Sequence, residues 1–139
     1  MPTVQKSLRL SEGIVREINE LAKTEKKDFT AVTNELLEEA VKAHRCPGII
    51  FSEGVSGRRA RIAGTGIEVW EVIASYRSVG ESLKRLKQIY SWLAEQQLRA
   101  ALGYYSYYAA EIDSFIEENE GWTPERIKDK YPFLTAGKP

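Results

Sequence analysis

The chain has 139 residues, of which 42% are hydrophobic and 29% are charged, and its formal net charge is zero. This composition is typical of a globular protein of one or two small domains and excludes a disordered chain. No apolar run approaches the roughly 20 residues of a membrane-spanning helix, and the first ten residues lack the apolar core of a signal peptide. One cysteine and one histidine exclude an internal disulfide and disfavour a zinc site. We therefore expect a cytoplasmic protein without a metal or another cofactor.

The first 45 residues predict a short strand, a helix, a polar turn and a second helix. In the segment QKSLRLS, Leu8 and Leu10 face one side of an extended chain. Three polar side chains face the other side: Gln5, Ser7 and Arg9. Ser11 is a favourable N-cap for the first helix, and Asp28 is one for a second helix that ends near His44.

A dimer would solve two problems of this segment. A single short strand has no partner within it, and 45 residues bury too little apolar surface to be stable alone. The stretch SLRLSEGIVREINELAKTEKKDFTAVTNELLEEAV resembles the ribbon-helix-helix family in its L-R-L strand end and in both helix lengths. The resemblance implies that residues 1–45 form an intertwined dimer. Lys6 departs from it, because the family usually has an apolar residue at this inward position.

The same resemblance implies binding to a double-stranded DNA operator, because the two-stranded ribbon of this family enters the major groove. The outward side chains, Gln5, Ser7 and Arg9, suit the edges of adenine and guanine. The start of the second helix and the lysines before it would hold a phosphate, and this set comprises Lys26, Lys27, Asp28 and Phe29. A plain dimerisation module is the alternative, since amphipathic patterns carry no information about DNA.

The second segment, residues 46–120, begins where Pro47 and Gly48 end the first module. Short extended pieces are expected at two places: Arg61-Ile62 and Ile67. Helical periodicity starts at Val69 and predicts two helices separated by Gly80. An apolar stripe then predicts one further helix of about 20 residues or more. This stripe comprises Leu98, Ala101, Leu102, Tyr105, Ala109, Ile112, Phe115 and Ile116.

This segment resembles a family of uncharacterised domains found in VapB-type antitoxins, with the pattern G-x-x-x-x-I-x-G-T-x-I-x-V. The matching residues are Gly57, Ile62, Gly64, Thr65, Ile67, Val69, Trp70, Gly80, Ser82, Leu86, Tyr90, Leu93, Ala100, Ala101, Leu102 and Tyr104. Gly66 replaces the usual arginine, and Glu68 and Ser91 replace prolines. The resemblance implies a trihelical, helix-turn-helix-like domain with a short β element, and it leaves DNA contact and protein docking open as its role.

Four tyrosines lie close together in the predicted long helix. At 100° per residue they cannot all face one core, so some are expected at a protein interface. The acidic stretch 111–120 beside them would suit the basic face of a ribonuclease. The predicted partner-binding residues are Tyr104, Tyr105, Tyr107, Tyr108 and Glu111. Packing in the core or in a dimer is the alternative for the tyrosines.

The tail, residues 121–139, repeats part of the preceding domain at constant spacing. One copy comprises Gly80, Ser82, Arg85, Lys87, Tyr90 and Leu93, and the other Gly121, Thr123, Arg126, Lys128, Tyr131 and Leu134. Thr123 as N-cap and Pro124 after it predict a short helix over residues 123–131. A duplicated partial unit and chance similarity are both open explanations.

The sequence thus predicts a mainly α protein. It also predicts that the protein is not an enzyme, because neither Cys46 nor the acidic run Glu117, Glu118 and Glu120 has a catalytic setting. The two resemblances together imply a transcriptional repressor that is the antitoxin of a type II toxin–antitoxin pair. Its partners would be an operator, a PIN-type ribonuclease toxin and a second copy of the chain. A stand-alone repressor whose second domain oligomerises or senses a ligand, and a scaffold that only oligomerises, are the alternatives.

Overall fold

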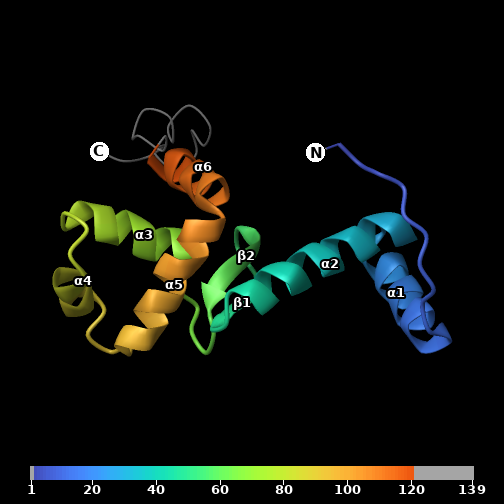
Figure 1. The fold of residues 1–139 in the computed structure, drawn as a ribbon, viewed down its shortest axis with the longest axis horizontal. Coiled ribbons are helices and arrows are strands. Elements are labelled where there is room, and N and C mark those ends of the chain that lie inside the picture. Colours follow the sequence, from blue (N-terminus) through green and yellow to red (C-terminus); the bar gives the residue numbers. More distant parts are fainter. Residues whose placement is uncertain (1, 121–139) are drawn as a thin grey trace, which may run out of the picture. The chain divides into compact units, whose positions relative to one another are not determined.

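The chain divides into two compact units, Met1–His44 and Arg45–Pro139, and the computed structural model describes residues 2–120. The described part is mainly helical, as predicted, with one small antiparallel sheet of two strands (Figure 1). Its elements are α1 (Glu12–Glu25), α2 (Phe29–Arg45), β1 (Ile49–Gly54), β2 (Gly57–Ile62), α3 (Val69–Ser78), α4 (Leu83–Ile89), α5 (Glu95–Tyr107) and α6 (Ala109–Glu120). The repeat and the short helix predicted in the tail fall outside the described residues.

No helix within residues 2–120 has the length and apolar character that crossing a membrane requires.

The helices of the first unit begin where the sequence predicts them to begin. The hydroxyl oxygen of Ser11 accepts a hydrogen bond from the backbone N–H of Ile14 at 3.3 Å. The carboxylate of Asp28 accepts one from the N–H of Ala31 at 2.7 Å. Each contact satisfies a backbone donor that has no partner within the first turn of a helix. Both N-caps are therefore confirmed, and Lys26 in a left-handed conformation, with φ of 57°, ends α1 between them.

Residues 2–10 belong to no helix or strand in the single chain, and all of them are exposed. A ribbon would form only with the strand of a second chain, so the single chain does not test it. The ribbon-helix-helix dimer stays a prediction.

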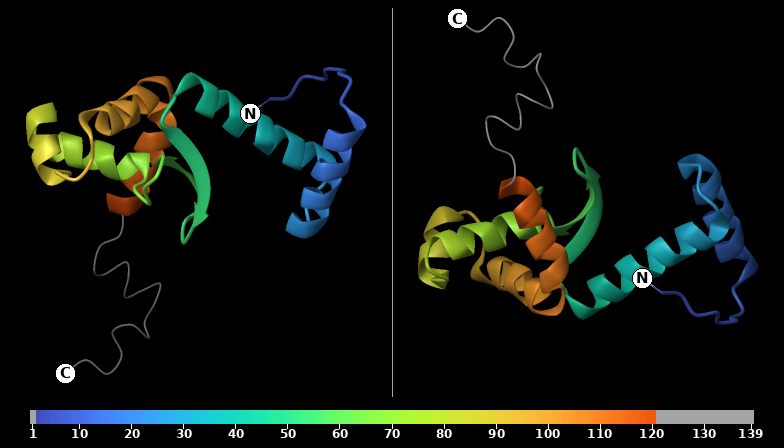
Figure 2. Two further views of the ribbon diagram at one scale, coloured as in Figure 1. Left: turned by 90° about the horizontal axis from the view of Figure 1, so that it is seen from below. Right: turned by 90° about the horizontal axis from the view of Figure 1, so that it is seen from above.

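Within residues 45–120, the second unit consists of a hairpin and four helices. Strands β1 and β2 pair from Ile49 with Ile62 to Gly54 with Gly57. Helix α3 packs against α4, α5, α6 and β2, and α5 also contacts both strands. Figure 1 shows α5 running across α3, and Figure 2 shows the turn of the hairpin extending away from the helices. The core comprises Cys46, Ile49, Ala60, Ile62, Val69, Val72, Ile73, Leu86, Leu93, Leu98, Ala101, Tyr104, Ile112 and Ile116.

One sequence prediction for this unit is wrong, and another is incomplete. The single long helix is two helices, because Tyr108 adopts a non-helical backbone with φ of −128° and ψ of 43° between α5 and α6. This break lets α6 pack against both α5 and α3, whereas a straight helix would extend past the core. The unit therefore has four described helices rather than three. The β element is also larger than expected, since β1 was not predicted.

Candidate interaction surfaces

The first unit leaves most of its apolar side chains in solvent. Among residues 2–44, only Ile18, Ala22 and Val32 form a buried cluster, and Phe29 packs partly against it. Eight large hydrophobic residues of this unit are exposed: Val4, Leu8, Leu10, Ile14, Leu21, Leu36, Leu37 and Val41. They come from the N-terminal segment and from both helices. We call these eight residues the apolar set, and an exposed set of this kind is typical of a protein interface.

The predicted base-contacting residues share the N-terminal segment with part of the apolar set. Gln5, Ser7 and Arg9 are all exposed. They alternate with Leu8 and Leu10, so that an extended chain would present the two groups on opposite sides.

The predicted phosphate-binding residues already make contacts within the chain. The ammonium group of Lys27 donates hydrogen bonds to both carboxylate oxygens of Glu35, at 2.9 and 3.0 Å. Asp28 caps α2, and the ring of Phe29 packs against the buried cluster. Lys26 is exposed at the end of α1. A phosphate at this helix start would therefore compete with Glu35 for Lys27.

The four tyrosines of the second unit differ in their surroundings, as predicted from helical geometry. Tyr104 is fully buried, and its hydroxyl donates a hydrogen bond to the carboxylate of Glu111 at 2.5 Å. Burial, and next this hydrogen bond, raise the pKa of Tyr104. Tyr107 is 60% exposed, whereas Tyr105 and Tyr108 are partly buried. Tyr104 is thus part of the core and is not available to a partner.

Three side chains from three helices form a polar network that the sequence did not predict. Arg77 of α3 approaches the carboxylate of Asp113 of α6 at 2.5 Å and the hydroxyl of Tyr105 of α5 at 2.5 Å. Tyr105 donates a hydrogen bond to the same carboxylate at 2.8 Å. The hydrogen bond from Tyr105, followed by that from Arg77, lowers the pKa of Asp113. The network therefore connects α3, α5 and α6 by side-chain hydrogen bonds at the surface.

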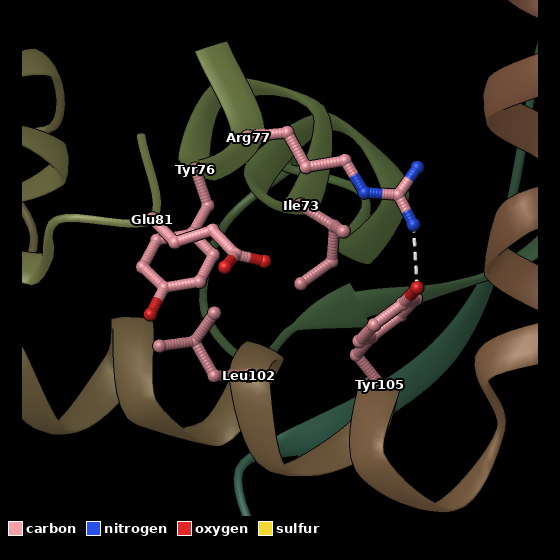
Figure 3. A pocket seen from close by; sticks show the side chains of 6 residues that line it. All are labelled: Ile73, Tyr76, Arg77, Glu81, Leu102 and Tyr105. Atoms are coloured by element: carbon pink, nitrogen blue, oxygen red, sulfur yellow. Dashed lines mark hydrogen bonds between the residues drawn. The ribbon is translucent and has the colours of Figure 1, made fainter. Parts of the chain in front are cut away.

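A pocket of about 240 Å³ lies beside this network. It is lined by Ile73, Tyr76, Arg77, Glu81, Leu102 and Tyr105 (Figure 3). Ile73 is buried and Leu102 is partly buried, so these two supply an apolar floor. The rim is polar, and the sequence predicted a binding role for only one of its members, Tyr105. The other rim residues could not be predicted, because α3 and α5 are distant in the sequence and come into contact only in the folded unit.

A second arginine, Arg59 of β2, is held by an aromatic ring and two acids. Its guanidinium lies 3.7 Å from the centre of the Phe115 ring and within 3.9 Å of Glu68 and 4.0 Å of Glu118. Glu68 also caps α3, since its own backbone N–H bonds to the carboxylate of Glu71. Glu68 therefore serves both as the N-cap residue of α3 and as a partner of Arg59.

Within residues 2–120, no three His, Cys, Asp or Glu side chains are grouped so that they could hold a metal ion. The single cysteine, Cys46, is buried, and burial raises the pKa of its thiol. A raised pKa keeps the thiol protonated and unreactive.

Residues 49–105 match a family model described as a protein of unknown function, DUF433. The matched region runs from the start of β1 into α5 and includes the hairpin, α3 and α4. No curated protein and no solved structure matches the chain. The family description assigns no activity, so the resemblances to ribbon-helix-helix proteins and to antitoxins stay predictions.

Proposed function

We propose that this protein is a sequence-specific DNA-binding repressor and the antitoxin of a type II toxin–antitoxin pair. In this proposal the first unit dimerises and binds a palindromic operator, and the second unit binds and neutralises a PIN-type ribonuclease toxin. The observation that carries the proposal is the exposed apolar set of the first unit, next to an unpaired N-terminal segment with outward polar side chains.

A second copy of the chain is the partner that best suits the apolar set. The N-terminal segment leaves its backbone N–H and C=O groups without a strand partner, and antiparallel pairing across a two-fold axis would satisfy both copies equally. The same association would cover Leu37 and Val41 of α2, which are 52% and 51% exposed. Full burial of one exposed leucine or valine is worth roughly 1.5–3 kcal/mol, so covering the apolar set in both copies would offset the cost of association.

The residues that dimerisation would leave on the outer face support the proposal of DNA binding. Once Leu8 and Leu10 turn toward the helices, the outer face of the ribbon carries Gln5, Ser7 and Arg9. An arginine can hold guanine O6 and N7 together, and a glutamine can hold adenine N6 and N7. Two copies related by a two-fold axis would contact a palindromic operator.

The second unit supports the protein-binding role. Its core leaves Trp92 69% exposed and Tyr107 60% exposed. Exposed tryptophan and tyrosine side chains are enriched at protein interfaces, where they supply much of the affinity. The acidic residues of α6 would add attraction toward a basic ribonuclease surface.

Two truncations test this division of labour, in cells that also express the neighbouring open reading frame. We expect a chain ending at Arg45 to bind DNA of its own promoter weakly but not to copurify with the toxin or restore growth. We expect a chain lacking residues 1–10 to lose operator binding but to retain the toxin. Neutralisation by the fragment ending at Arg45 would place the toxin site in the first unit, and failure of the full chain to shift promoter DNA would remove the repressor role.

A further inference from the structure

The residue after Gly80 adopts a backbone conformation that its side chain disfavours. Glu81 has φ of 58°, in the left-handed region that glycine, and to a lesser degree asparagine, occupies most readily. Its backbone N–H donates a hydrogen bond to the carbonyl of Tyr76 at 2.8 Å and thereby closes the end of α3. This backbone contact requires no side chain. A glycine would fit this backbone with less strain, so the turn itself does not require the carboxylate of Glu81.

The carboxylate of Glu81 forms part of the pocket beside α3 and α5. Within residues 2–120, neither this carboxylate nor the hydroxyl of Tyr76 makes a hydrogen bond or an ion pair. In Figure 3 the carboxylate is directed over the middle of the pocket, whereas the guanidinium of Arg77 is directed toward Tyr105. Nη2 of Arg77, the one positive side chain of the lining, thus already contacts Asp113 and Tyr105.

The charges of the pocket favour a cation. Arg77 is neutralised by Asp113 at 2.5 Å, so the charge of Glu81 remains uncompensated. Tyr76 and Tyr105 supply aromatic rings, and Ile73 and Leu102 an apolar floor. An arginine side chain suits all three parts of this lining. Its apolar stem can pack on the floor, and its planar guanidinium can stack on tyrosine and donate hydrogen bonds to a carboxylate. The same unit already stacks Arg59 on Phe115 at 3.7 Å.

We propose that this pocket binds one arginine side chain of the protein that the second unit captures. The proposal rests on the partner-binding role proposed above and names the contact that the partner makes. A side chain within a polypeptide suits the pocket better than free arginine, because the one cation of the lining is paired with Asp113 and an α-carboxylate would compete with that contact. The uncompensated negative charge also disfavours a nucleic acid as the occupant.

The test uses the full chain and does not require the partner. N-acetyl-L-arginine methylamide is titrated into the ¹⁵N-labelled protein, and amide shifts are followed by NMR. We expect saturable shifts confined to the end of α3, Glu81 and the part of α5 around Leu102, and no such shifts with N-acetyl-norleucine methylamide. Glu81→Gln should weaken the binding about 10- to 100-fold, because it removes the negative charge and one of the two acceptor oxygens. Glu53→Gln, which removes an exposed acid of β1 outside the pocket, should leave it unchanged.

Glu81→Gly separates binding from folding. Glycine removes the carboxylate but suits the left-handed backbone, so the variant should lose arginine binding while its melting temperature rises or stays the same. Equal binding of the norleucine compound, or binding unaffected by Glu81→Gln, would overturn the proposal. Much tighter binding of free arginine would point to a small-molecule site instead. If the arginine compound binds but no toxin copurifies, the pocket stands and the proposed function fails.

Discussion

Residues 2–44 and residues 45–120 both consist largely of amphipathic helices, but they use their apolar residues differently. The second unit encloses fourteen buried residues in one core, from Cys46 to Ile116, whereas the first buries three. In the first unit the larger apolar residues, such as Leu21 and Leu37, are exposed. The sequence patterns of the two units are alike, so periodicity alone does not show which helices bury their apolar side chains within the single chain.

The two units differ in the origin of their stability. The second unit can hold its fold through its own packing and through the network of Arg77, Tyr105 and Asp113. The first unit has too little buried surface for this, and its folding should be coupled to association. Its stability should therefore increase with protein concentration, while that of the second unit should not.

The largest expected effect comes from placing a charge in the apolar set. Leu37→Glu should weaken dimerisation about 100-fold or more, because the dimer would bury an unpaired carboxylate. Operator binding should be lost with it. Analytical ultracentrifugation and a gel shift with promoter DNA measure the two effects.

The matched control is Val55→Glu in the turn of the hairpin. Val55 is 109% exposed and Leu37 is 52% exposed, so the single chain predicts little effect from either substitution. Only a dimer through the first unit makes Leu37 the more sensitive position. If the two variants dimerise equally well, the apolar set is not the dimer interface.

The second unit should respond to loss of a buried hydroxyl. Tyr104→Phe removes the hydrogen bond to Glu111 and should destabilise this unit by about 1.5–3 kcal/mol, the usual contribution of a hydrogen bond to a charged group. Tyr107→Phe removes an exposed hydroxyl and serves as the control. Hydrogen exchange in the full chain assigns the loss to its unit. A loss in residues 2–44 would contradict the separation of the two units.

Local signals made the helix starts predictable from sequence. Ser11 and Asp28 act as caps through contacts three residues away, which the sequence displays directly. The break at Tyr108 carries no such signal, because neither proline nor glycine stands there and the apolar spacing continues across it. The break is stabilised by packing of α6 on α3, which is a contact between distant segments.

The pocket could not be predicted for a similar reason. Its lining combines α3, the residue after Gly80 and α5, and each part taken alone looks like ordinary helix surface. The left-handed backbone of Glu81 is also invisible in the sequence, where Gly80 beside it accounts for the turn. The tyrosine cluster was visible, but only the folded unit distinguishes buried Tyr104 from exposed Tyr107.

A smaller effect is expected at the outer face of the proposed ribbon. Arg9→Ala should reduce operator binding by about 1–3 kcal/mol and relax the preference at one base pair. Lys27→Ala should weaken binding to all sequences alike, and by less than a free lysine would, because Glu35 already holds its ammonium group. Binding measured against operator variants and salt concentration separates the two. Sequence-independent losses from both substitutions would contradict a base-contacting role for Arg9.

The smallest expected effect is a pH dependence of the second unit alone. The hydrogen bonds from Tyr105 and Arg77 lower the pKa of Asp113 from its ordinary value of 3.8. A carboxyl whose pKa is lower in the folded state contributes stability above its unfolded pKa, and this contribution is lost as the pH falls from about 3.8 through the lowered value. The Asp113 side chain is 44% exposed, so solvent and salt should keep the contribution small.

Asp113→Asn should remove this part of the acid-induced destabilisation, and Glu117→Gln should not. The test is denaturant unfolding from pH 6 to pH 2, followed through the amides of α3 and α6. An identical dependence of stability on pH for the wild type and Asp113→Asn would show that the network does not stabilise the unit.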